Sequence, residues 1–257
     1  MIQRPMELRF PIGETLTYDL RLLGVHAGVA RIAVLPPRLR AGRLLLPFVG
    51  AMKSEGLFSR LFKLVVDQHV YVDRHDLLPR FARVDFVRQS VKRDLRFTFS
   101  PTRSRVSTLL IDGGRRRKTY WHQIPKLTLD TLSSVYWIRC QSLALRSRLR
   151  FGLYLGRSPY VIEMVVRRRV LVSTPLGTYH TLALEGWSTR YRAGRSSSNA
   201  PKPKTGDGFR IGSAQRLTTF WLYVTDDHQR IPVKASFQSR FGTGEALLSR
   251  VEIKRYK

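Results

Sequence analysis

Short runs in which apolar and polar residues alternate recur along the whole chain, and they constrain the fold more than any other feature. Between residues 15 and 22, for example, every second residue is apolar. A period of two is the pattern of a half-buried β-strand. Turn residues separate the runs at the short spacing of an antiparallel meander. We predict strands at residues 15–22, 29–35, 44–51, 65–73, 80–89, 93–100, 103–112, 118–124, 148–155, 160–173, 178–192 and 247–253, with a hairpin at 220–233.

One stretch has helical periodicity instead. After Pro125, apolar residues between Leu129 and Leu143 recur at steps of three and four, and Thr128 or Asp130 can serve as the N-cap. The sequence therefore predicts an all-β fold with one helix, in which a large curved antiparallel sheet or half-barrel has the helix covering its concave side.

A single domain over residues 1–257 fits this pattern better than two. The segment at about 193–208 is rich in Gly, Ser, Pro and Lys, which predicts a flexible loop. Strands of the same character lie on both sides of it. We therefore interpret it as a long hairpin loop and not as a domain linker. A turn of amphipathic helix is possible at residues 53–64.

The chain is strongly basic, with 46 lysines and arginines against 18 aspartates and glutamates and a formal net charge of +28. Most of these cations are arginines, whose planar guanidinium suits bidentate binding of phosphate and carboxylate groups. Anionic lipid, lipopolysaccharide and acidic glycan are therefore candidate partners. Nucleic acid is less favoured, because the arginines are dispersed and no nucleic-acid-binding motif accompanies them. The alternative is that the charge is compositional.

The candidate anion-binding residues are two runs of consecutive cations, namely Arg115, Arg116, Arg117 and Lys118, and Arg167, Arg168 and Arg169. The first run follows two glycines in a predicted loop, so a solvated hairpin tip is its alternative interpretation. The second run interrupts an apolar strand. At least one of its arginines is expected to face inward, to snorkel or to mark a β-bulge.

The location of the protein is left open by the sequence. No run of 18 apolar residues is present, so we expect no transmembrane segment. Residues 1–10 lack an apolar core of signal-peptide length. The protein is then either cytoplasmic, or periplasmic or outer-membrane-associated with its signal peptide already removed. Cys140 is the single cysteine, which excludes an internal disulfide.

The predicted hairpin at 220–233 has an acidic turn, in which Arg230 and Pro232 follow Asp226 and Asp227. Two carboxylates that converge on one site can share general acid and base work, which makes a hydrolase one hypothesis. Adjacent side chains usually point apart, however, and an aspartate in a turn accepts hydrogen bonds from nearby backbone amides. We favour a structural role, in which Arg230 pairs with one carboxylate and Pro232 begins the second strand.

No motif for a metal or a cofactor is present, and we expect neither. The six histidines lack the spacing of a metal site. The stretch Gly242-Thr243-Gly244 lacks the helix and the Lys-Ser/Thr pair of a phosphate-binding loop. No G-x-S-x-G nucleophile motif occurs.

Several fragments, taken together, resemble a family of bacterial envelope proteins known as domain of unknown function 3108. In chain order they are Gly13-Glu14-Thr15-Leu16-Thr17-Tyr18, the glycines Gly24 and Gly28, Ser54-Glu55-Gly56-Leu57-Phe58, Asp67 with Tyr71-Val72-Asp73, Leu77-Leu78-Pro79, Asp130-Thr131-Leu132-Ser133-Ser134-Val135-Tyr136-Trp137-Ile138-Arg139, Thr174 with Gly177 and Tyr179, and the segment from Trp221 to Val233.

The resemblance covers residues 13 to about 248. It implies a β-rich protein of the periplasm or outer membrane, commonly exported, with no established activity and no catalytic residues. This chain departs from the family pattern in its large positive charge and in lacking a signal peptide. We expect structural roles for the following residues of the matching fragments: Gly13, Glu14, Tyr18, Asp130, Tyr136 and Arg139.

The favoured hypothesis is a non-enzymatic cell-envelope protein that binds an anionic or amphiphilic envelope component, or that docks with a partner protein in an envelope assembly. In its lipid version, apolar side chains on the concave face hold acyl or peptide groups, and arginines at the rim meet phosphate or carboxylate. This version predicts a continuous apolar groove of ligand size. The alternatives are a nucleic-acid-binding basic protein and a hydrolase that uses Asp226 and Asp227.

Overall fold

The computed structural model describes residues 7–192, 218–239 and 242–256. Within these residues, sixteen strands form one continuous sheet. The strands are β1 (Glu14–Leu22), β2 (Val25–Val34), β3 (Arg38–Arg40), β4 (Arg43–Ser54), β5 (Leu64–Asp73), β6 (Pro79–Arg88), β7 (Val91–Ser100), β8 (Arg105–Asp112), β9 (Arg116–Gln123), β10 (Thr128–Leu129), β11 (Arg148–Tyr154), β12 (Pro159–Thr174), β13 (Gly177–Arg190), β14 (Thr218–Thr225), β15 (Pro232–Ser239) and β16 (Gly242–Ile253).

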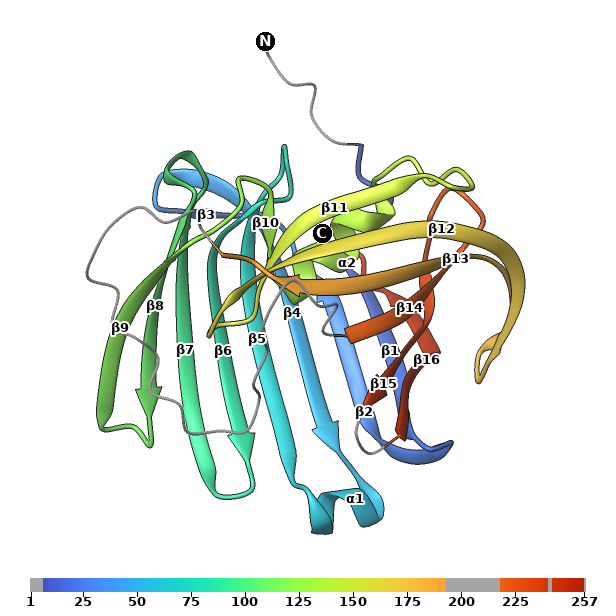
Figure 1. Cartoon of the computed structure of the whole chain (residues 1–257), viewed down its shortest axis with the longest axis horizontal. Helices are drawn as coiled ribbons and strands as arrows, with labels where there is room; N and C mark the ends of the chain where they lie inside the picture. Colours follow the sequence, from blue (N-terminus) through green and yellow to red (C-terminus); the bar gives the residue numbers. More distant parts are fainter. Residues whose placement is uncertain (1–6, 193–217, 240–241, 257) are drawn as a thin grey trace.

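The strand order shows that two meanders are joined by the two ends of the chain. One meander runs from β1 to β9 and the other from β10 to β16, and β1 pairs antiparallel with β16 between them. The two ends of this strand order are therefore β9 and β10, which are neighbours in sequence, and the short β3 lies beside the order and pairs with β4. Figure 1 shows the resulting strongly curved, barrel-like sheet. The prediction of a large curved antiparallel sheet is confirmed, and among the strands of the described residues only the short pair of β10 with β11 is parallel.

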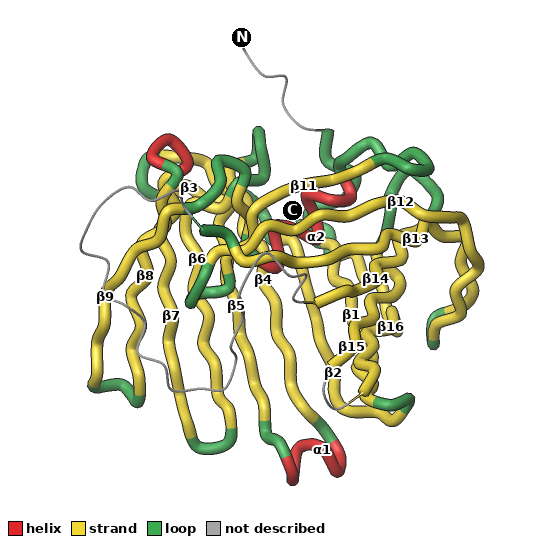
Figure 2. The backbone as a smooth tube through the Cα atoms, in the orientation of Figure 1, coloured by secondary structure: helices red, strands yellow, loops and turns green. Residues whose placement is uncertain are grey.

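Helix α2 (Thr131–Arg139) lies inside the curve of this sheet, as predicted (Figures 1 and 2). It buries Leu132, Tyr136, Trp137 and Ile138. Gly50 of β4 makes room for the helix, because a Cβ at this position would lie 2.9 Å from the Leu132 side chain. The helix ends earlier than the apolar periodicity suggested, so the buried Leu143 belongs to the loop that follows it.

The prediction of a single helix is wrong in one respect. Among the described residues there is a second short helix, α1 (Gly56–Leu61), as well as a 3-10 turn at Pro101–Arg103. Helix α1 joins β4 to β5 at one end of the sheet, within the segment where the sequence allowed a helical turn. It is too short to cover a face of the sheet, so the architecture is unchanged.

The main core cluster fills the space between α2 and the concave face. Its centre is aromatic: the ring of Tyr136 lies 4.4 Å from that of Phe48 and 4.7 Å from that of Phe10, measured between centroids. A second cluster is built around Leu16, Tyr18 and Leu248 where the two ends of the chain pair. Residues far apart in sequence therefore share both cores.

Tyr154, the last residue of β11, connects the part of the sheet next to β10 with strands β7, β8 and β9. Its hydroxyl lies 2.7 Å from Oγ1 of Thr108 on β8 and 3.0 Å from Nδ1 of His122 on β9. Its ring also packs edge-on against Phe97 and Phe99 of β7. These contacts hold the end of the second meander against the last strands of the first, which gives the sheet its barrel-like closure.

The predicted loop at 193–208 lies outside the described residues. The strands on either side of it, β13 and β14, pair antiparallel from Thr181 with Thr225 to Ser188 with Thr218.

Candidate functional site

The residues assigned structural roles gather around a buried ion pair at the end of α2. The guanidinium of Arg139 donates to both carboxylate oxygens of Glu14, at the start of β1, and the two side chains are 1% and 3% exposed. Arg139 also donates to the carbonyl oxygens of Arg9 and Gln229. One side chain thus connects the helix, the first strand, the segment before it and the β14–β15 turn.

Gly13 precedes Glu14 in a conformation that only glycine adopts readily. Its φ is +94°, and a Cβ there would lie 2.0 Å from the carbonyl oxygen of Lys254. The backbone N–H of Lys254 donates to the carbonyl oxygen of Gly13, which ties the first strand to the last. A side chain at this position would push the two ends of the chain apart next to the Glu14 carboxylate.

Asp130 is the N-cap of α2, and Thr128 belongs instead to β10. One carboxylate oxygen of Asp130 accepts hydrogen bonds from the backbone N–H of Leu132 and Ser133, and the Ser133 hydroxyl accepts from the backbone N–H of Asp130 in return. Burial raises the pKa of the Asp130 carboxyl, against the effect of these hydrogen bonds. This capping box fixes where α2 begins above the sheet.

Asp226 and Asp227 have separate partners. Oδ1 of Asp227 accepts from the Thr225 hydroxyl and from the backbone N–H of Arg230, whereas Oδ2 of Asp226 lies 2.6 Å from Nε of Arg169. The Asp227 carboxylate therefore fixes the β14–β15 turn and the Asp226 carboxylate holds Arg169 of β12, so the two do not converge on one site. The contact between Asp227 and Arg230 is made by the backbone N–H and not by the expected side-chain ion pair. Strand β15 begins at Pro232, whose carbonyl oxygen accepts from the Tyr18 hydroxyl at 2.8 Å.

The two candidate anion-binding runs lie on different parts of the sheet. Arg115 is in the β8–β9 turn, and the three following cations begin the exposed edge strand β9 instead of lying in a loop. Glycines at positive φ close this turn within a few residues, so the strand starts early.

In the second run, the register of β12 shifts between Val166 and Arg168, which places a bulge at Arg167. Nε of Arg167 donates to Oε2 of Glu185 at 2.7 Å. The guanidinium of Arg168 lies 5.8 Å from the ring centroid of Trp221. Arg169 is held by Asp226. Carboxylates of the chain already meet two of these three arginines.

An apolar groove lies on the concave face between α2 and strands β11, β12, β14 and β15. It has a volume of about 340 Å³, and among the described residues none of those that line it is charged. Its lining includes Val135, Ile138, Phe151, Met164, Phe220 and Phe237. The groove therefore combines helix side chains on one wall with a floor of strand side chains.

Two phenylalanines on the floor of this groove lie over glycines of neighbouring strands. A Cβ at Gly186 would lie 2.4 Å from the ring of Phe220, and a Cβ at Gly244 would lie 2.6 Å from the ring of Phe237. These four residues form one row across β13 to β16, in which Gly186 pairs with Phe220, Phe220 with Phe237, and Phe237 with Gly244. The sequence analysis missed this row, although a glycine inside a strand is a signal for close approach of another group.

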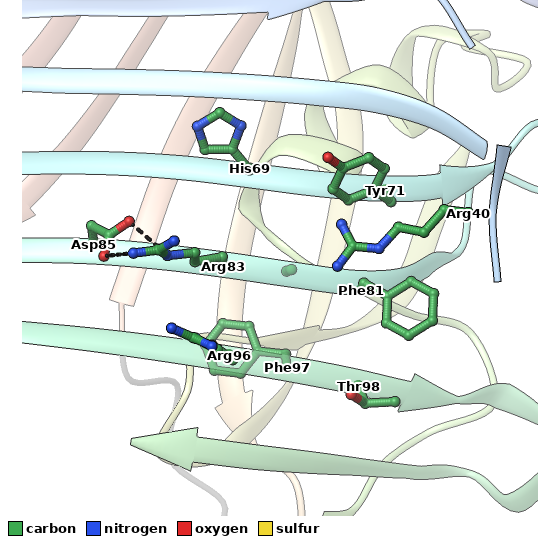
Figure 3. A pocket seen from close by; sticks show the side chains of 10 residues that line it. Arg40, His69, Tyr71, Phe81, Arg83, Asp85, Arg96, Phe97 and Thr98 are labelled. Atoms are coloured by element: carbon green, nitrogen blue, oxygen red, sulfur yellow. Dashed lines mark hydrogen bonds and ion pairs between the residues drawn. The ribbon is translucent and has the colours of Figure 1, made fainter. Parts of the chain in front are cut away.

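A hollow of about 490 Å³ lies on the opposite face of β5, β6 and β7 (Figure 3). Arg40, Arg83, Arg96 and His69 line it, together with Asp85 and the rings of Tyr71 and Phe81. This site was not predicted from the sequence either. Its residues alternate with core residues along three strands, but only the strand register brings them side by side.

Among the described residues, no group of three or more His, Cys, Asp or Glu side chains is arranged to hold a metal ion. No helix in the described part of the chain is long and apolar enough to cross a membrane.

Comparison with known proteins gives a family and a fold. The model of the family described as "Protein of unknown function (DUF3108)" matches residues 16–249. A β-barrel-like protein of domain of unknown function DUF1849 from Brucella abortus is similar in structure, with a TM-score of 0.56 and 9% identity over 97% of this chain and 100% of that chain. At this identity the likeness shows a shared fold and nothing more.

Two other solved structures align over most of their length with lower scores. A protein described as exported, with a YmcC-like fold, from Bacteroides fragilis has a TM-score of 0.33 and 10% identity over 94% of this chain and 96% of that chain. A protein described as a lipoprotein from Parabacteroides distasonis has a TM-score of 0.35 and 8% identity over 95% of this chain and 98% of that chain. The comparison with curated proteins finds no match.

Proposed function

The chain belongs to the family of proteins of unknown function DUF3108, and we propose that it is a non-enzymatic protein of the cell envelope that binds an amphiphilic molecule. The apolar part of the ligand, an acyl chain, lies in the groove between α2 and strands β11, β12, β14 and β15. The observation that carries this proposal is the groove itself, which is concave and uncharged.

The size and lining of the groove fit this role. Ligand sites are typically concave, mostly apolar and roughly 300–1,000 Å³ in volume, and this groove has about 340 Å³. Because no charged side chain lines it among the described residues, an ionised group would lose its hydration there without gaining a partner. The anionic end of the ligand therefore stays outside the groove.

Filling the groove tests this proposal. Ala235 lies on its floor next to Leu222 and is replaced by tryptophan. We expect the affinity for a fluorescent fatty acid to fall by about tenfold or more, because the indole occupies the space of the acyl chain. Fluorescence titration measures the affinity, and solvent extraction of the purified protein followed by mass spectrometry shows which lipids copurify.

The matched control is Ala51→Trp, which places the same side chain at an exposed position on β4. Its affinity should stay within about twofold of the wild-type value. Equal affinity of the wild type and Ala235→Trp, or no binding by either, would contradict the proposal.

The envelope location follows what the family resemblance implies. We expect the product of the full-length gene, expressed in a bacterium, to fractionate with a periplasmic or outer-membrane marker. Recovery with a cytoplasmic marker enzyme would contradict the location and leave the binding proposal to be judged by the titration.

A further inference from the structure

The hollow in Figure 3 is built by strand register. Across β5, β6 and β7, His69 pairs with Arg83 and Arg83 with Arg96, so these three residues form a row. In the next row on the same face, on the side towards β3, Tyr71 of β5 pairs with Phe81 of β6. Along β5, the neighbours Val70 and Val72 are fully buried in the main core. Because side chains alternate along a strand, the hollow lies on the face away from that core and from the apolar groove.

A third arginine closes one end of the hollow. Arg40 is the last residue of β3, and Ala41 and Gly42 after it have φ values of +49° and +72°, as in a tight two-residue hairpin turn. Its guanidinium lies 4.3 Å from the ring centroid of Tyr71 and 5.1 Å from that of Phe81. Figure 3 shows this side chain reaching between the two rings, on the same side of the sheet as Arg83 and Arg96.

Two aspartates hold the other arginines in place. In Arg83, Nε lies 2.9 Å from Oδ2 of Asp85 and Nη2 lies 3.2 Å from Oδ2 of Asp94. In Arg96, Nε and Nη2 lie 3.2 Å and 2.9 Å from the same Oδ2 atom of Asp94. A guanidinium has five N–H donors. Among the described residues, these contacts leave the Nη1 group of both arginines for a further acceptor. The ion pairs also fix the two side chains, which lowers the entropy cost of binding a ligand.

The charges around the hollow favour an anion. Among the described residues, three arginines line it, and two carboxylates contact them: Asp85, which also lines the hollow, and Asp94, which pairs with Arg83 and Arg96. Asp94 and the more distant Asp67 belong to the same acidic row as Asp85, on the far side of the arginine row. An anion that enters the hollow therefore meets the guanidinium of Arg40 at one end and those of Arg83 and Arg96 at the other. The aspartates lie beyond Arg83 and Arg96.

We propose that this hollow is a binding site for a phosphate group of a ligand. A planar guanidinium fork suits bidentate binding of phosphate oxygens, and Arg40 supplies one from one side of the hollow. From the other side, Arg83 and Arg96 supply the N–H donors of their Nη1 groups. The site is separate from the apolar groove, so it goes beyond the proposed lipid binding and can fail independently of it. The ligand carries its phosphate either as a lipid headgroup or as a soluble phosphate ester.

The test is calorimetric titration of the protein with inorganic phosphate. We expect saturable binding that weakens as salt is added. Arg40→Ala should lower the affinity by about tenfold, and the double variant Arg83→Ala with Arg96→Ala should abolish it. Arg40→Lys keeps the charge but loses the planar fork, so its affinity should fall between those of the wild type and Arg40→Ala.

The control is Arg88→Ala, which removes the same charge from an exposed position of the same strand β6, where Arg88 lies over the ring of Phe62 and outside the hollow. It should bind phosphate within about twofold of the wild type. The proposal is overturned if the wild type shows no saturable binding in the millimolar range, or if Arg88→Ala weakens binding as much as Arg40→Ala.

Sedimentation with phosphatidylcholine vesicles, with and without phosphatidic acid, identifies the source of the phosphate. Binding to the acidic vesicles that Arg40→Ala removes assigns a lipid headgroup. Binding of inorganic phosphate without binding of these vesicles assigns a soluble phosphate ester. The groove variant Ala235→Trp should bind phosphate like the wild type, so failure of lipid binding in the groove and failure of the phosphate site are distinguishable.

Discussion

Replacing Arg139 by methionine is expected to lower the free energy of unfolding by about 3–5 kcal/mol. The substitution leaves the Glu14 carboxylate buried at 3% exposure without its cation. It also removes the donor to the carbonyl oxygens of Arg9 and Gln229. These two hydrogen bonds hold the segment before β1 and the β14–β15 turn against α2. Urea denaturation followed by circular dichroism measures the loss.

A second variant separates the lost partner from lost packing. Glu14→Gln combined with Arg139→Met removes both charges, and we expect it to recover part of the stability lost in Arg139→Met, because no unpaired charge stays buried. The surface control is Arg250→Met, whose ion pair with Glu252 spans 3.7 Å between side chains that are 65% and 50% exposed. It should cost less than about 1 kcal/mol. Similar losses for Arg139→Met and Arg250→Met would refute a dominant role for the buried pair.

Replacing Tyr136 by alanine is expected to cost about 3–5 kcal/mol, which is typical of a large aromatic side chain removed from a core. The Tyr136 ring is fully buried, stacks on Phe48 and packs at a tilt against Phe10, so its loss opens a cavity between α2 and β4. Thermal and urea unfolding measure the change.

Tyr136→Phe provides the matched comparison. The Tyr136 hydroxyl is buried without a hydrogen-bond partner among the described residues. Burial raises the pKa of this hydroxyl well above its usual value, so the group stays protonated. Its removal therefore deprives no other group of a partner, and we expect Tyr136→Phe to be neutral or slightly stabilising. A loss as large as that of Tyr136→Ala would show that the hydroxyl, and not the ring, holds the core together.

Local pattern was sufficient to predict most elements of the fold. The alternation around Leu16 and Tyr18 predicted a strand that the structure places at β1, and both side chains are buried where that strand pairs with β16. The helical steps from Leu132 to Tyr136 predicted α2. These patterns are readable because each strand or helix must turn one apolar face to the core, and this requirement acts on residues close together in sequence.

Local pattern failed where a feature depends on pairing between distant strands. The row of His69, Arg83 and Arg96 exists only because three strands align at one register. The same holds for Phe220 over Gly186 and Phe237 over Gly244. Runs of adjacent cations were predicted from the sequence instead, and the structure places one on the edge strand β9 and the other at a bulge of β12. Neighbours in sequence alternate between the two faces of a strand, so a run of cations rarely forms one site.

By itself, the sequence determined that this chain forms a curved sheet of many antiparallel strands around one main helix, and fragment by fragment it indicated the family. Only the tertiary structure decided that the two chain ends pair through β1 and β16, that Arg139 meets Glu14 beneath them, and that an apolar groove and an arginine-lined hollow lie on opposite faces. The physical reason is the distance along the chain over which each effect acts. Burial patterns act over a few residues along the chain, whereas strand register and the partners of buried charges are set by the packing of the whole sheet.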